Sequence, residues 1–89
     1  MRTSCPDCAR KHLGQASVLM DEAILGYPLH KWLAIGHLAE AESELLADAP
    51  YISNNIREHR VAYINDTSYV VPILTLIGDI SVWVDTDKA

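Results

Sequence analysis

Apolar side chains recur every three or four residues along most of this chain, which is the spacing of one face of an α-helix. Clusters of glycine, proline, asparagine and aspartate interrupt the pattern and mark turns. We expect a turn at residues 1–8, three helices within 9–64 (at about 8–25, 29–47 and 51–64) and a fourth at 68–85. Ser4 and Asp7 are the side chains that can cap the first helix. The pattern predicts a single all-α domain over residues 1–89, a small bundle of about four helices.

The same spacing identifies the side chains expected to form the core. In the first three helices they are Leu13, Ala16, Leu19, Met20, Ala23 and Ile24; Ala34, Leu38, Ala41 and Leu45, with Trp32 and Ile35 beside them; and Ile52, Ile56, His59 and Tyr63. In the last helix they are Val70, Ile73, Ile77, Ile80 and Val84. A chain of this length buries only ~60–65% of the surface that it exposes when unfolded. A bound metal or a partner subunit would therefore add useful stability.

The last segment, 68–85, has two interpretations, because its many valines and isoleucines also suit a strand. The helical spacing of its apolar residues favours a helix, and Pro72 is tolerated in a first helical turn. The segment is apolar on most sides, so we expect it at the centre of the bundle or in a homodimer interface through Tyr69–Val84. Pro72, Gly78 and Asp79 interrupt the run, which is too short for a membrane span.

Charge and composition limit the classes of partner and the cellular compartment that we expect. Twelve acidic residues against seven basic ones give a formal net charge of −5. Nonspecific nucleic-acid binding needs an excess of lysine and arginine, so a nucleic-acid partner is not expected. The first ten residues lack the apolar stretch of a secretory signal, and we expect a cytoplasmic protein. In a reducing compartment, a Cys-x-x-Cys pair is more often a metal or redox site than a structural disulfide.

Both cysteines of the chain lie in the stretch Cys5-Pro6-Asp7-Cys8, and His12 follows Cys8 by one helical turn. Two thiolates and one imidazole make three of the four ligands of a tetrahedral zinc site. The sequence therefore predicts zinc at the N-terminal turn, with the fourth ligand to come from elsewhere in the chain.

The fourth ligand can come from His30, His37, His59 or a carboxylate of the second helix, and His37 and His59 are the main candidates. His37 lies in a His-Leu-x-x-Ala sequence that repeats the one at His12, which places a histidine at a similar edge of two paired helices. An antiparallel hairpin centred near Tyr27, however, sets His12 level with Glu42, about five residues or ~7 Å away from His37. His59 lies closer on this simple geometry. We favour His37 and predict a zinc site made by Cys5, Cys8, His12 and His37.

The cysteine pair has two further interpretations. It can be a pair of free or oxidisable thiols without a metal. The sequence Cys-Pro-x-Cys at a helix start also resembles the redox motif of thioredoxin and glutaredoxin. A helix N-terminus lowers the pKa of a thiol and so favours redox chemistry at such a position. The βαβ pattern of that fold is absent from the sequence, which makes a thiol redox protein the weaker alternative.

Arg57, Arg60 and Tyr63 lie at helical spacing and form a candidate site for a small anionic ligand or a nucleotide. The competing interpretation is that both arginines form salt bridges with the acidic side of the second helix, which carries Glu42. No glycine-rich phosphate loop, nucleophile elbow or Ser/His/Asp order occurs in the sequence. We therefore predict no catalytic residues.

Four stretches in the first half of the chain carry a resemblance to known sequences. They are Cys5-Pro6-x-Cys8, Arg10-Lys11-His12-Leu13, Gly26-Tyr27-Pro28-x-His30-x-Trp32 and Gly36-His37-Leu38-Ala39-Glu40-Ala41-Glu42. They resemble a group of small uncharacterised proteins from bacteriophages and bacteria. The resemblance implies a short helical protein, often encoded by phage, and brings no catalytic residues to this chain.

The paired helices also resemble HEPN-type bundles. The Arg-x-x-x-x-His nuclease signature of that group is missing, because Arg57 and His59 stand too close together.

We therefore expect a non-enzymatic, zinc-stabilised helical binding protein, such as a phage accessory factor that acts on a host protein. The alternatives are an anion or nucleotide binder using Arg57 and Arg60, and a thiol redox protein.

Overall fold

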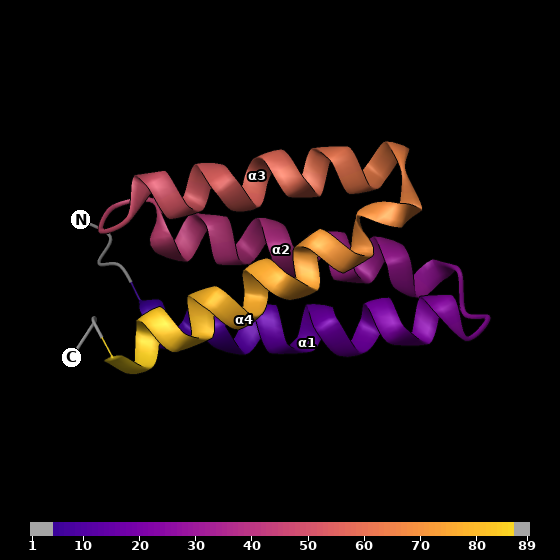
Figure 1. Cartoon of the computed structure of the whole chain (residues 1–89), viewed down its shortest axis with the longest axis horizontal. Coiled ribbons are helices and arrows are strands. Elements are labelled where there is room, and N and C mark those ends of the chain that lie inside the picture. Colours follow the sequence, from indigo (N-terminus) through magenta and orange to yellow (C-terminus); the bar gives the residue numbers. More distant parts are fainter. Residues whose placement is uncertain (1–4, 87–89) are drawn as a thin grey trace.

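Within residues 5–86, which a computed structural model of the chain describes, four α-helices are joined by short turns (Figure 1). The helices are α1 (Pro6–Ile24), α2 (Leu29–Leu45), α3 (Pro50–Asn65) and α4 (Val70–Thr86), with a 3₁₀ turn at Thr67–Tyr69 before α4. Helices α1 and α2 form an antiparallel hairpin, α3 runs back along α2, and α4 crosses against α1 and α3. The predicted all-α bundle is confirmed, including a helix rather than a strand in the last segment.

Proline, glycine and aspartate set the helix ends. Gly26 ends the α1 hairpin arm with a φ of +121°, a conformation that side-chain-bearing residues rarely adopt. Pro50 begins α3, where its missing amide proton is not needed. Asp66 caps the 3₁₀ turn. The hydroxyl and the amide of Ser68 donate hydrogen bonds to the Asp66 carboxyl group, and these bonds lower the pKa of that group.

The cap of α1 differs from the prediction. The N-cap residue is Cys5, whose Sγ accepts a hydrogen bond from the Cys8 amide at 3.1 Å. Asp7 lies inside the first turn instead, where a negative charge still favours the helix N-terminus. Ser4, the other predicted cap, lies outside the described residues.

The buried side chains follow the predicted stripes in α2 and α4 and only in part in α1 and α3, where four predicted positions are partly buried: Leu19, Ala23, Ile52 and His59. All the expected core positions of α2 and α4 are buried: Ala34, Leu38, Ala41, Leu45, Val70, Ile73, Ile77, Ile80 and Val84. In α1 the buried residues are Ala9, Leu13, Ala16 and Met20, and in α3 they are Ser53, Ile56 and Tyr63. Ile35 is buried too, but Ile24 and Trp32 are 60% and 56% exposed. They are exposed because the tip of the α1–α2 hairpin projects beyond the ends of α3 and α4 (Figure 1).

Helix α4 lies on the outside of the bundle rather than at its centre. One of its faces is buried against α1 and α3, whereas Val71 and Val82 on the other face are 66% and 62% exposed. At its C-terminal end Asp85 pairs with Arg10 of α1, which brings both ends of the described chain to one end of the bundle (Figure 1). The homodimer interface through Tyr69–Val84 would use the open face of α4 and stays a prediction.

The run Thr67–Thr86 corrects one detail of the sequence analysis. It is one helical stretch of 20 residues with a hydropathy of 1.5, long and apolar enough by length and composition to cross a membrane. Five of its side chains belong to the core, and 28% of the apolar stretch is buried in the bundle.

Replacing Gly26 by alanine should destabilise the α1–α2 turn by about 1–3 kcal/mol, because φ at this residue is positive. Gly36→Ala is the matched control. Gly36 is exposed inside α2, and an added Cβ there would meet nothing within 4 Å, so alanine should stabilise the helix by about 0.5–1 kcal/mol. Urea unfolding followed by circular dichroism measures both changes. Equal stabilities for the two variants would contradict the turn geometry.

Candidate metal centre

Two histidines meet where α1 and α2 face each other. Nδ1 of His12 lies 3.0 Å from Nδ1 of His37, and the centres of the two rings are 5.2 Å apart. Both side chains are partly buried. At this distance the two nitrogens cannot both carry a proton, so at least one lone pair points into the space between the rings.

The register of the α1–α2 hairpin brings this pair together. The Cys5 amide donates a hydrogen bond to the Glu44 carbonyl at 3.1 Å, which fixes Cys5 opposite Glu44. Seven residues along α1 from Cys5 lead to His12 (5 + 7), and seven residues back along α2 from Glu44 lead to His37 (44 − 7). Seven residues are about two helical turns, so both steps return to the same face. The prediction that His12 lies level with Glu42 is therefore wrong by about five residues.

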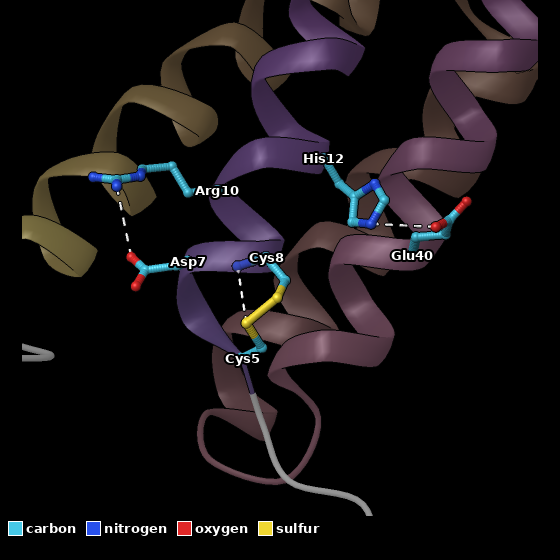
Figure 2. Close-up of a disulfide and its surroundings, with 6 residues drawn as sticks. All are labelled: Cys5, Asp7, Cys8, Arg10, His12 and Glu40. Atoms are coloured by element: carbon cyan, nitrogen blue, oxygen red, sulfur yellow. Dashed lines mark hydrogen bonds and ion pairs between the residues drawn. A yellow bond between two sulfur atoms is a disulfide. The ribbon is translucent and has the colours of Figure 1, made fainter.

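Glu40 completes the group from α2. Its Oε2 lies 3.2 Å from Nε2 of His12 (Figure 2), and the potential ligand atoms of His12, His37 and Glu40 all lie within 4.8 Å of one another. A carboxylate that accepts the Nε2 proton leaves Nδ1 with its lone pair, the arrangement that orients histidine ligands in zinc sites. Glu40 is one of the second-helix carboxylates that were possible fourth ligands, but His37 was preferred to it. Its spacing of three residues from His37 was the available signal, because it places both on one helix face.

Cys5 and Cys8 are joined to each other by a disulfide at the start of α1 (Figure 2). Their Cα atoms are 5.2 Å apart, which is within the usual range for such a bond. The structure therefore brings together two of the four predicted zinc ligands, His12 and His37, and pairs the other two. A sulfur in a disulfide is not a thiolate and cannot serve as a strong zinc ligand.

His59, the other candidate for the fourth ligand, is engaged elsewhere. Its Nδ1 donates a hydrogen bond to the Asn55 carbonyl at 2.8 Å, and its ring packs edge-on against Tyr69. His30 lies at the far end of the hairpin, where Nδ1 is 3.0 Å from Oε1 of Glu22. Both histidines lie outside the metal-ligand group and provide control positions for it.

The predicted anion site does not assemble as one unit. Arg57 and Arg60 line a cavity of about 560 Å³ between α2 and α3, but Arg60 forms a two-point ion pair with Glu42. Tyr63 is buried in the core, where burial raises the pKa of its hydroxyl and the Lys31 ammonium lies 5.0 Å from the ring centre. The salt-bridge interpretation is confirmed for Arg60. Arg57 alone of the three is exposed.

A groove of about 740 Å³ runs beside His37, with Gly14, Val18 and Leu19 along it and Lys11 and Gln15 among its lining residues. It is an open depression in the surface that reaches the edge of the histidine pair. Of the two histidines, His37 is the one that lines the groove.

Comparison of the chain with models of protein families, with curated proteins and with solved structures gives no match. The resemblance of the first half to small bacteriophage and bacterial proteins, and the phage accessory role that it implies, stays a prediction. The stretches that carry this resemblance include His12, His37 and Glu40. The geometry of these three residues supplies the functional argument.

Proposed function

We propose that this chain is a small, non-enzymatic helical protein that binds zinc between α1 and α2 and uses the stabilised bundle to engage a partner. The supporting observation is the close approach of the two Nδ1 atoms, 3.0 Å, with Glu40 against the opposite nitrogen of His12. Two nitrogens bound at ~2.0–2.1 Å to one tetrahedral zinc ion lie ~3.3 Å apart. The rings therefore need only a small movement to accept an ion.

A hydrogen bond between the rings of His12 and His37 is the competing explanation for their contact. It would make the pair a polar contact at the edge of the core, with no ion involved. Glu40 favours the metal interpretation, since a carboxylate behind a histidine is the usual second partner of a zinc ligand. The two explanations differ in whether added zinc changes the stability of the folded protein.

Zinc content and thermal unfolding test the proposal on the wild-type chain and three variants. Zinc at about 100 times its Kd should add about 2.7 kcal/mol of stability, which raises the Tm of a domain of this size by roughly 10–20 °C. His12→Ala and His37→Ala should lose both the ion and the shift. His59→Ala, the matched control, should keep both.

Two results would contradict the proposal. An unchanged Tm of the wild-type chain with added zinc would leave the pair as a hydrogen bond. Equal loss of zinc in the His59→Ala and His37→Ala variants would mean that zinc depends on the fold in general rather than on this pair.

The partner in this proposal is a host protein, and the protein acts in the cytoplasm. Exposed apolar side chains support such a contact: they gather at the tip of the α1–α2 hairpin, where Leu25, Tyr27 and Leu29 are 79%, 60% and 76% exposed. Exposed apolar clusters of this kind mark protein contacts in many small domains. The role proposed for the ion is stabilising rather than catalytic, because it would hold α1 and α2 together at the histidine pair.

A further inference from the structure

We infer that the Cys5–Cys8 disulfide is a redox gate on the histidine pair, so that reduction supplies two thiolates and completes a four-ligand zinc site with His12 and His37. The inference rests on the proposed zinc function and concerns its control. In the disulfide form three groups, His12, His37 and Glu40, offer ligand atoms close together. In the reduced form two stronger zinc ligands become available beside them.

Both cysteines lie along the seam of α1 and α2 that holds the histidines. Cys8 precedes His12 by one helical turn, which sets their Cβ atoms about 5–6 Å apart. Figure 2 shows that the side chains of Cys8 and His12 leave α1 on the side that faces α2. Cys5 is held at the same seam, because its amide is bonded to the Glu44 carbonyl.

The turn that holds the disulfide also suits a metal-bound pair. Two sulfurs bound at ~2.3 Å to one tetrahedral zinc ion lie ~3.8 Å apart, and a Cys-x-x-Cys turn at a helix start can hold them there. The Cys8 amide already donates to Sγ of Cys5 at 3.1 Å. The same donor, at the positive end of the α1 dipole, would stabilise the negative charge of a zinc-bound thiolate. The turn thus already holds a backbone donor that would stabilise one of the two sulfurs once the disulfide is open.

The chemistry balances with a dithiol as reductant. The dithiol gives two electrons and two protons to the sulfur–sulfur bond, which becomes two thiols, while the dithiol itself becomes a cyclic disulfide. Zinc then binds both sulfurs and releases their two protons to solvent. A peroxide or a disulfide acts as the opposing oxidant: it takes two electrons from the two thiolates and two protons from solvent, and becomes two waters or two thiols. The Cys5–Cys8 bond forms again, and zinc loses two of its four ligands.

The test compares zinc binding by the oxidised and the reduced chain in the absence of oxygen, after the dithiol has been removed by gel filtration. Competition with a chromophoric chelator measures the affinity, and Co²⁺ in place of zinc reports sulfur ligands through a thiolate-to-cobalt charge-transfer band. The reduced chain should bind at least about tenfold more tightly than the oxidised one and show the band. The double variant Cys5→Ser/Cys8→Ser should bind like the oxidised chain under both conditions.

The outcomes separate this inference from the proposed function. Equal affinity in both states, without the cobalt band, would overturn the gate and leave zinc at the histidine pair. No binding in either state would overturn both. A band that survives in the His37→Ala variant with undiminished affinity would show a thiol site independent of the histidines, which also overturns the gate.

Discussion

Replacing Tyr63 by alanine should lower the free energy of unfolding by about 3–5 kcal/mol. Tyr63 is 1% exposed and is the largest fully buried side chain among residues 5–86. Its removal leaves a large cavity in a core that is small to begin with. Because domains of this kind are stable by only about 5–15 kcal/mol, this loss is a large fraction of the total stability. Urea unfolding followed by circular dichroism measures the loss.

Tyr63→Phe is the matched control and also isolates the hydroxyl group. It keeps the ring, so stability near neutral pH should change by less than about 1 kcal/mol. Burial raises the pKa of Tyr63 above its usual value of 10.0. The unfolded chain therefore loses this proton at a lower pH than the folded chain, and stability that is fully present below pH 10.0 falls as pH rises from there to the folded-state pKa.

This loss of stability at high pH comes from the Tyr63 hydroxyl and should be absent from Tyr63→Phe. The difference in unfolding free energy between the wild-type chain and this variant should then be constant up to about pH 9 and change as the pH rises to about 10.5 and above, in the direction that favours the variant at high pH. A constant difference over this range would show that the hydroxyl titrates alike in the folded and unfolded chains. Small losses for both Tyr63→Ala and Tyr63→Phe would contradict the central place of this ring in the core.

Replacing Arg60 by alanine should cost about 1–3 kcal/mol, whereas Arg57→Ala should change stability by less than about 0.5 kcal/mol. The Arg60 and Glu42 side chains are only 22% and 13% exposed, so removing the guanidinium leaves a largely buried carboxylate without its partner. Partial exposure keeps the effect below that of a fully buried pair. Chemical unfolding of both variants measures the contrast.

A double variant decides whether the stability lost in Arg60→Ala comes from the Glu42 carboxylate, which is left without an ion-pair partner. Adding Glu42→Gln to Arg60→Ala removes the stranded charge and should recover part of the loss. The rival hypothesis of an anion site predicts a different result, in which Arg57→Ala and Arg60→Ala weaken the binding of inorganic phosphate equally. Equal stability of these two variants together with a shared loss of phosphate binding would favour that rival.

The fold was largely predictable, because helical spacing and helix-ending residues act locally. The core positions of α4 show this best: Val70, Ile73, Ile77, Ile80 and Val84 were all identified from their spacing, and all are buried. Ile24 and Trp32 have the right spacing but too little protein around them. Spacing identifies the apolar face of a helix and not how far its neighbours extend along it.

The candidate site was predicted only in part, because it depends on how two helices slide against each other. A hairpin centred on Tyr27 separates His12 from His37, whereas the bond between Cys5 and Glu44 shifts the register and joins them. No local feature of the sequence sets this shift. The state of the cysteines is equally undetermined by spacing, since one Cα separation serves both a disulfide and a shared metal.

The ion pair between Arg10 and Asp85 has a consequence for how the chain can be rearranged. Because it joins the first turns of α1 to the last turn of α4, the two ends of the described chain come near each other at one end of the bundle (Figure 1). A short linker could close the backbone into a ring without stretching it. New ends opened at the exposed Gly26 turn would then leave every helix whole, and we expect the permuted chain to fold into the same bundle.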